Sequence, residues 1–187
     1  MKSRYTAFTQ QSYCCVPACL QMVMYRRELP LIEQEVLGFE LGLTVPKEDI
    51  HMFNKVRTGK KPPAGWGTQI SRPEFSIDKA LKRLNVPLQA RIHTIDYIES
   101  AQMLRKFLED SQAAGGDTLL CFNYGKLWDK DTDSGHVCVF DRIDGDSVWI
   151  IDPGRNAPKH REVPLDKLYE AMVAHGSSKS AGAWEIY

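Results

Sequence analysis

A helix with almost no polar face is the feature that most constrains how this chain can fold. Pro17 fits only into a first helical turn, where its missing N–H costs nothing, so we expect a helix to begin within a residue or two of Cys15. The helix formers that follow end in Arg26 and Arg27, and only Gln21 interrupts an apolar surface. The apolar positions are Val16, Cys19, Leu20, Met22, Val23 and Met24. A helix that is apolar on nearly all sides is buried, so the rest of the chain must cover it.

The position of Cys15 at the start of this helix indicates a reactive thiol. A helix N-terminus presents N–H groups without partners and a partial positive charge, and both favour a thiolate over a thiol. The alternative is that Cys14, Cys15 and Cys19 are small buried apolar residues. The chain has 5 cysteines, an odd number without the spacing of a disulfide framework, which favours reduced thiols.

The composition is that of an ordinary globular protein. With 187 residues, of which 43% are hydrophobic and 26% charged, we expect a single domain over residues 1–187. The formal net charge is zero, which gives no indication of a nucleic acid or an anionic membrane as partner. No apolar stretch approaches the roughly 20 residues that span a bilayer, and the first residues lack the apolar core of a secretion signal. We therefore expect a soluble, cytoplasmic protein that has no membrane segment and binds no nucleic acid.

Helices dominate the first third of the chain, and strands follow. The periodicity predicts helices over residues 31–42, 47–53, 76–84, 96–115 and 164–172. It predicts strands over residues 87–93, 118–124, 136–143, 147–152 and 183–187. The sequence Asp144-Gly145-Asp146 is a strong turn signal, so the third and fourth of these strands should form an antiparallel hairpin. The predicted class is α+β with an antiparallel sheet.

Residues 57–75 are rich in Gly, Pro, Lys and Thr and are predicted to form a long loop. Loops of this length inside a compact domain are usually functional or mobile. Trp66 stands between two glycines in this segment. It could line a substrate groove, or it could fold back onto the body of the protein.

A histidine and an aspartate are expected to meet at one edge of the hairpin. His136 opens one strand and Asp152 closes the next, immediately before Pro153. If the strands pair in simple register, the start of the first lies opposite the end of the second. A carboxylate beside an imidazole fixes its tautomer and stabilises the imidazolium, which a thiol–imidazole pair requires of a third residue. Cys138 shares the strand face of His136 and is expected to be core beneath the site.

Together these motifs resemble the C39 and C39-like family of papain-fold cysteine peptidases. The resemblance is carried by Gln10, Cys15-Val16-Pro17-Ala18-Cys19-Leu20-Gln21-Met22, Gly135-His136-Val137-Cys138-Val139 and Ile151-Asp152-Pro153. In that family a glutamine precedes the start of the nucleophile helix, and a histidine strand is followed by an Asp-Pro pair. The resemblance implies a papain-like α+β fold, with N-terminal helices packed on a C-terminal antiparallel sheet. Without a transporter segment, the chain is similar to the stand-alone members.

By this resemblance, each site residue has a role. Cys15 would be the nucleophile, His136 the general base and acid, and Asp152 the residue that orients the imidazole. Gln10 would donate to the oxyanion beside the Cys15 backbone N–H. The implied activity is that of a thiol peptidase or amidohydrolase that cleaves a peptide or amide bond of a peptide or protein substrate, with no cofactor and no metal.

Three positions depart from the family pattern. Val16 stands where the family usually has Gly, and its branched side chain could crowd the approach of substrate. Gln10 is one residue closer to Cys15 than the family's glutamine is, so Gln11 or neither could be the oxyanion donor. Cys14 could be the reactive thiol, although Cys15 is favoured because the residues after it then align with the family motif.

Other functions remain open from the sequence. The same residues could pass an acyl group to an amine or thiol, as a transglutaminase-like acyltransferase does. The fold could also be a catalytically silent peptide-binding module with an occluded thiol, which Val16 favours. A metal site built from Cys14, Cys15, Cys19 and a histidine is disfavoured, because adjacent cysteines do not give the Cys-x2-Cys spacing of a zinc knuckle.

Overall fold

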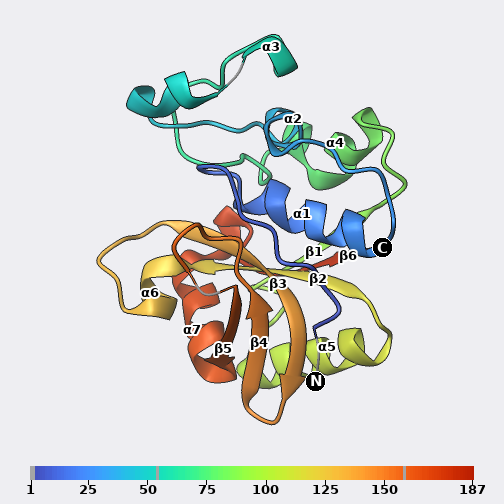
Figure 1. Cartoon of the computed structure of the whole chain (residues 1–187). Coiled ribbons are helices and arrows are strands. Elements are labelled where there is room, and N and C mark those ends of the chain that lie inside the picture. The colour runs from blue at the N-terminus through green and yellow to red at the C-terminus, as the bar shows by residue number, and fades with distance from the viewer. Residues whose placement is uncertain (1–2, 54, 158) are drawn as a thin grey trace.

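An antiparallel sheet of six strands separates two layers of helices (Figure 1). This computed structural model describes residues 3–53, 55–157 and 159–187. The strands are β1 (Ala90–Thr94), β2 (Asp117–Asn123), β3 (Gly135–Asp144), β4 (Ser147–Ile151), β5 (His160–Pro164) and β6 (Gly182–Ile186). Their order across the sheet is β1-β6-β2-β3-β4-β5, and neighbouring strands are antiparallel. The predicted α+β class with an antiparallel sheet is confirmed.

The longer helices lie on both faces of the sheet. One face carries α1 (Cys15–Arg26), α2 (Gln34–Glu40) and α4 (Ile77–Arg83), and the other carries α5 (Ala101–Ala113) and α7 (Leu165–His175). The shorter elements are α3 (Lys55–Thr58), α6 (Tyr124–Trp128) and the 3-10 turns η1 (Lys47–Met52), η2 (Pro73–Phe75) and η3 (Ser177–Lys179). No helix in the described ranges is long and apolar enough to cross a lipid bilayer.

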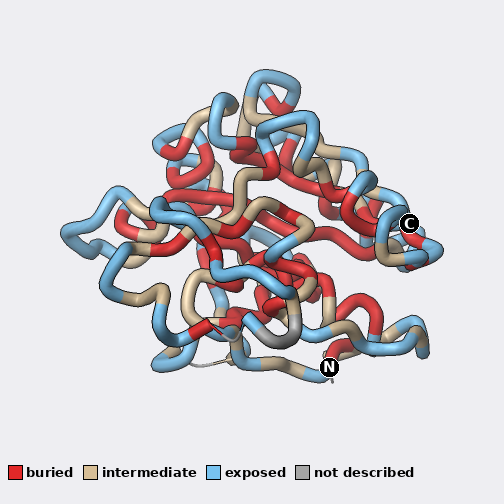
Figure 2. The backbone as a smooth tube through the Cα atoms, turned by 90° about the horizontal axis from the view of Figure 1, so that it is seen from above, coloured by how far each residue is buried: buried red, intermediate tan, exposed pale blue. Residues whose placement is uncertain are grey.

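Successive side chains along each strand point to opposite faces of the sheet, so the protein has one hydrophobic core on each face. In β3, Val137 and Val139 pack with α1, while Cys138 and Phe140 pack with α5 and α7. Figure 2 shows the buried positions gathered in the middle of the molecule, with exposed positions outside. The buried residues of α1 are Val16, Pro17, Ala18, Cys19, Leu20, Met22, Val23 and Met24, which confirms that this helix is internal.

The hairpin predicted at Gly145 is confirmed, because β3 and β4 pair across this turn. Gly145 has a φ of +57°, a left-handed conformation that glycine adopts without strain. The pairing is not in simple register, since a β-bulge lies between Phe140 and Arg142. Beyond the bulge Val139 pairs with Ile151. Asp152, the residue after β4, therefore lies opposite the first half of β3.

Two helices are shorter than the periodicity suggests. The helix predicted from Asp96 begins at Ala101, because the hydroxyl of Ser100 caps it by accepting a hydrogen bond of 3.1 Å from the N–H of Met103. The helix predicted over residues 31–42 is limited to Gln34–Glu40.

Several elements have no counterpart in the sequence prediction, among them α3 and η2, which lie at the two ends of the segment predicted as a long loop. β5 is an edge strand in which only Val163 is buried, so it lacks the apolar alternation that marks a strand. α6 has only 5 residues, and the side chain of Asn123 caps it by accepting from the N–H of Lys126. A single helical turn of this length carries no usable periodicity.

Asp117, at the start of β2, holds the C-terminal end of α1. Its buried carboxylate accepts hydrogen bonds from Arg26 and Arg27 and, at 2.6 Å, from the hydroxyl of Tyr5. Burial, together with the negative charge of Asp117, raises the pKa of Tyr5, so the hydroxyl stays protonated and remains a donor. The last turn of α1 is thereby tied to the sheet and to the N-terminal segment.

Replacing Asp117 with alanine should lower the free energy of unfolding by about 2 to 4 kcal/mol, because both arginines and the tyrosine lose a buried partner. Urea unfolding followed by circular dichroism measures the change. The control is Asp110→Ala on α5, which removes an exposed ion pair with Lys106 and should cost under about 1 kcal/mol. An equal loss in the two variants would show that Asp117 does not anchor α1.

Candidate active site

Cys15 occupies the first turn of α1. Cys14 is the N-cap, and the first hydrogen bond of the helix runs from the N–H of Ala18 to the Cys14 carbonyl at 3.0 Å. Pro17 has no N–H, so its place in the first turn costs no hydrogen bond. The N–H groups of Cys15 and Val16 have no partner within the helix. Together with the helix dipole, they favour negative charge on the thiol or on an oxygen bound beside it.

His136 and Asp152 are hydrogen-bonded to each other. His136 is the second residue of β3, and Asp152 directly follows β4. The distance from His136 Nε2 to Asp152 Oδ1 is 2.7 Å, and the two residues are 8% and 0% exposed. The β3–β4 pairing therefore brings these residues together as the sequence predicts, despite the bulge farther along the hairpin.

Asp152 is held by further donors besides His136. Oδ1 also accepts from the N–H of Gly154 at 2.8 Å, and Oδ2 accepts from Arg161 at 2.9 Å. Burial alone would raise the pKa of Asp152, but the hydrogen bonds from His136, Gly154 and Arg161 outweigh it and lower the pKa to about 2. Asp152 is therefore a permanent negative charge beside the imidazole at neutral pH.

The Cys15 thiol lies within hydrogen-bonding reach of the His136 ring, and both residues line the same two cavities. Because Nε2 is bonded to Asp152, Nδ1 is the ring nitrogen left for the thiol. The structure thus brings together the three residues that the sequence analysis assigned to a nucleophile, a base and an orienting carboxylate.

The surroundings of His136 favour its protonated form. Burial alone would lower the pKa of His136, but contact with the sulfur of Cys138 and the hydrogen bond to Asp152 outweigh it and hold the pKa well above its usual value. Burial raises the pKa of Cys138 to about 12, so its thiol is neutral at neutral pH. The charge of Asp152 is therefore the interaction that sustains an imidazolium.

Gln10, rather than Gln11, faces the site. Gln10 lines a cavity together with Cys15 and His136, and its side chain makes no hydrogen bond within the described part of the chain. Its backbone is fixed by a hydrogen bond of 2.8 Å from its N–H to the carbonyl of Pro153. Gln11 is exposed, and its N–H is bonded to Gln34. The amide of Gln10 is therefore free to bind a substrate at Cys15.

Cys14 is placed differently from its neighbour. It is 0% exposed and packs with Leu43, Val45 and Phe53, whereas Cys15 is partly exposed. Burial, followed by the proximity of Cys15, raises the pKa of Cys14 to about 12. Cys14 is therefore a core thiol, protonated at neutral pH.

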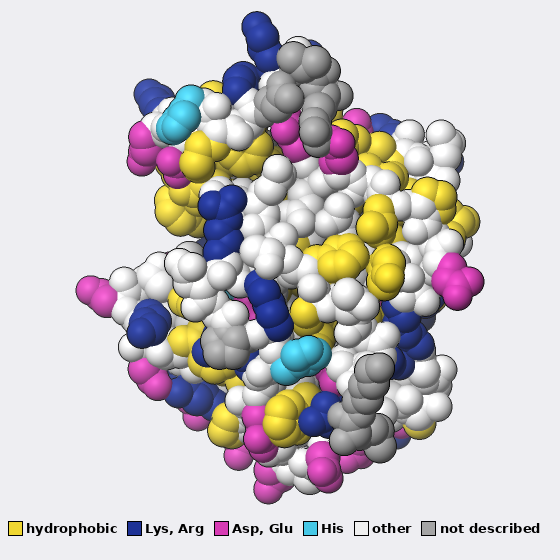
Figure 3. Space-filling model, in the orientation of Figure 1, with side chains coloured by type: hydrophobic (Ala, Val, Ile, Leu, Met, Phe, Trp, Pro, Cys, Tyr) yellow, Lys and Arg dark blue, Asp and Glu magenta, His cyan; other side chains and the backbone are white. Residues whose placement is uncertain are grey.

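A groove crosses the molecule at Cys15. Two cavities of about 320 Å³ and about 420 Å³ meet there and share Trp66 and His136 as walls. The smaller cavity continues toward His175, and the larger one continues toward Gln10. Figure 3 shows the surface hollowed at the left, where the helical layer meets the sheet layer. An extended chain has room on both sides of the thiol.

Residues 66–71, within the segment predicted as a loop, form one wall of this groove. Bridges from Thr44 to Gly67 and from Val45 to Ala64 hold the loop against the helical layer. Trp66 is 61% exposed and packs edge-on against the Tyr13 ring, with centroids 5.1 Å apart. Of the two predicted roles for this tryptophan, the placement beside the groove is the one observed.

Val16 lies beside the thiol at the floor of the smaller cavity. Its side chain is 2% exposed and packs with the core.

The sequence analysis missed Arg161 and Tyr124. Arg161 lies on β5 opposite Ile150 of β4, and that pairing is what brings it to Asp152. Tyr124 follows β2 and packs edge-on against His136 with ring centroids 5.4 Å apart. Both could have been found only from the strand order, since neither is near the other site residues in sequence.

A metal ion fits this cluster poorly. The described residues contain one group of three side chains whose possible ligand atoms lie within 4.8 Å of one another. It consists of His136, Cys138 and Asp152. His136 Nε2 and Asp152 Oδ1 are already bonded at 2.7 Å, which leaves no space for an ion between them. Both oxygens of Asp152 are also occupied, by Gly154 and Arg161.

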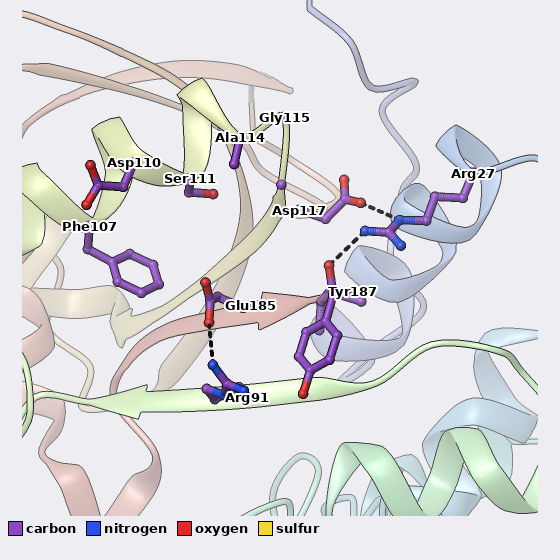
Figure 4. A pocket seen from close by; sticks show the side chains of 12 residues that line it. Arg27, Arg91, Phe107, Asp110, Ser111, Ala114, Gly115, Asp117, Glu185 and Tyr187 are labelled. Atoms are coloured by element: carbon purple, nitrogen blue, oxygen red, sulfur yellow. Dashed lines mark hydrogen bonds and ion pairs between the residues drawn. The ribbon is translucent and has the colours of Figure 1, made fainter.

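A separate cavity of about 650 Å³ lies between the end of α1, α5 and β6 (Figure 4). Its charged groups neutralise one another, since Arg27 is bonded to Asp117 and Arg91 lies 4.0 Å from Glu185. It contains neither a thiol nor an imidazole. We therefore place the candidate site in the groove at Cys15.

Native protein treated with iodoacetamide should be alkylated at Cys15 and not at Cys14, because only Cys15 combines exposure with a neighbouring imidazolium. Peptide mapping by mass spectrometry identifies the modified cysteine. Modification of Cys14 first would contradict this assignment.

Comparison with solved structures identifies the fold. A C39-like peptidase from Bacillus anthracis is 20% identical with a TM-score of 0.57, over 96% of this chain and 93% of that chain. A double glycine motif protease from an AMS/PCAT transporter, solved in complex with the leader peptide, is 14% identical with a TM-score of 0.55, over 99% of this chain and 91% of that chain. No family profile and no curated protein sequence matches the chain, so the likeness lies in three-dimensional structure. The chain therefore has the fold of C39 peptidases.

Proposed function

We propose that this protein is a thiol-dependent peptidase or amidohydrolase in which Cys15 attacks a peptide or amide carbonyl. The observation that carries the proposal is the arrangement of Cys15 at a helix N-terminus, within reach of an imidazole that is itself bonded to the buried carboxylate of Asp152. Thiol, imidazole and carboxylate in this order form the arrangement required for nucleophilic catalysis. The fold shared with C39 peptidases adds support.

The reaction divides into two steps. The Cys15 thiol gives its proton to His136, and the sulfur forms a bond to the substrate carbonyl carbon. The C–N bond then breaks as His136 gives that proton to the leaving amine, which leaves a thioester on Cys15. In the second step His136 takes a proton from water, whose oxygen bonds to the thioester carbon. The C–S bond then breaks, the carboxylic acid leaves, and His136 returns the proton to the Cys15 sulfur. Asp152 remains ionised throughout, since its pKa is lowered to about 2.

The negative oxygen that develops on the carbonyl requires donors close to Cys15. The N–H of Cys15 lies at the positive end of α1, and the side-chain amide of Gln10 lines the same cavity. Donors that are already in place before the reaction need no reorganisation when the charge appears, and this is usually the largest contribution to catalysis. We assign the oxyanion site to these groups.

Peptides and proteins are the substrate class that the groove favours. The two cavities extend in different directions from Cys15, so chain can be bound on both sides of the scissile bond. One protein with this fold was solved with a leader peptide bound.

The experiment that tests the proposal is cleavage of a peptide library prepared by tryptic digestion of a whole proteome, with products identified by mass spectrometry. We expect new termini with the wild type and none with Cys15→Ala. Adding a primary amine separates hydrolysis from acyl transfer, since transfer gives products heavier by the amine. Cleavage that persists in Cys15→Ala, or no product with the wild type, would overturn the proposal.

Replacing Gln10 with alanine should reduce kcat by about 100- to 1,000-fold with little change in KM, because the lost donor acts mainly in the transition state. Gln11→Ala is the matched control and should retain nearly full activity, since Gln11 points away from the groove. Steady-state kinetics on one cleaved peptide measures both. Equal losses in the two variants would remove Gln10 from the oxyanion site.

A further inference from the structure

His175 is a buried histidine that the proposed reaction does not use. It is the last residue of α7, is 9% exposed, and lines the smaller cavity beside Cys15. Its Nδ1 atom is buried and has no hydrogen-bond partner among the described residues. A buried lone pair without a donor is tolerated more readily than a buried N–H without an acceptor, so Nδ1 is the nitrogen without a proton.

The other edge of the His175 ring faces the start of β3. A Cβ at Gly135 would lie 2.4 Å from His175 Cε1 and 2.6 Å from Nε2, so only glycine allows the ring this position. Gly135 lines the same cavity and directly precedes His136. The Nε2 edge of His175 is therefore next to the site of the proposed reaction.

The tautomer of His175 follows from its surroundings. Burial, and then the charge of Lys179, lower the pKa of His175, while Asp133 opposes them, so the ring is neutral at neutral pH. A neutral imidazole carries one N–H, and a buried N–H without an acceptor is costlier than a buried lone pair without a donor. The proton is therefore on Nε2, where it is a hydrogen-bond donor at the cavity wall.

The rest of the cavity combines an apolar floor with a polar end. The floor consists of Val16, Ile70, Cys121, Val137 and Trp184, all of them buried. At the polar end the exposed carboxylate of Asp133 lies 3.4 Å from Lys179 and accepts a hydrogen bond of 2.7 Å from Asn123. An uncharged polar group would find a donor in His175 and an acceptor in Asp133 there.

We propose that this cavity is a substrate subsite that binds an uncharged amide side chain, that of glutamine or asparagine, close to the scissile bond. The amide carbonyl accepts a hydrogen bond from His175 Nε2–H, and the amide NH2 group donates to the carboxylate of Asp133. The methylene groups lie on the apolar floor. The volume of about 320 Å³ is near the lower end of the range for ligand cavities, about 300 to 1,000 Å³, and so fits a side chain rather than a large ligand. As a subsite for cleavage, the assignment rests on the proposed function.

Binding can be tested without catalysis. The probe is N-acetylglutamine methylamide, titrated into the Cys15→Ala protein while the ring signals of His175 are followed by NMR. We expect a saturable shift of these signals, weaker by about 3- to 10-fold with N-acetylnorleucine methylamide, which keeps the stem and lacks the amide. No shift of the His175 signals, or equal affinity for the two probes, would overturn the subsite whether or not the protein is a peptidase.

Specificity provides the second test. Among library peptides cleaved by the wild type, glutamine and asparagine should be enriched at one position near the scissile bond. His175→Leu should lower kcat/KM for these peptides by about 3- to 10-fold relative to peptides with leucine there, and His175→Gln, which restores an N–H donor, should recover part of the preference. His51→Leu is the matched control, because His51 is exposed on η1 and lines none of these cavities.

The two proposals fail in different ways. Absence of cleavage by the wild type would remove the peptidase proposal and leave the binding test to decide the subsite. Cleavage without an amide preference, or with a preference that His175→Leu leaves unchanged, would remove the subsite and leave the peptidase proposal standing. A loss in His175→Leu that is equal for amide and leucine peptides would show that His175 has only a structural role.

Discussion

The packing of α1 on β3 is the contact on which the whole site depends. Cys19, one helical turn after Cys15, donates its S–H to the carbonyl of Val137 at 3.3 Å. Val137 is the residue that follows His136, so a contact in the buried core sets the position of both reacting groups at once. Asp117 holds the far end of the helix to β2. The position of α1 on the sheet therefore determines the position of the Cys15 thiol.

The imidazole and its carboxylate are fixed by a different part of the molecule. β3 and β4 bring His136 and Asp152 together, and β5 adds Arg161 to the same carboxylate. A buried carboxylate with these partners keeps its charge, and the charge in turn keeps the imidazole oriented. The sheet thus supplies a complete acid–base pair without any contribution from the helical layer.

The sequence predicted those parts of this arrangement that have a local signal. Pro17 marks the start of α1 and Gly145 marks the hairpin, and from these two positions most of the site follows. β5 could not be predicted, because its residues are mostly polar and its place is set by pairing with β4. Cys14 and Cys15 are adjacent in sequence, and only packing buries one and exposes the other. His175 lies beyond the end of the helix predicted over residues 164–172, and only the fold places it against the start of β3.

The division of the site between two layers has a mechanical consequence. The sulfur moves with the helical layer, while the imidazole and carboxylate move as one unit with the sheet. A small slide of α1 along the sheet would lengthen the sulfur–imidazole contact and leave the 2.7 Å bond between His136 and Asp152 intact. A misplacement of about 1 Å can slow a reaction about 100-fold. The reaction rate therefore depends on how α1 is seated on the sheet.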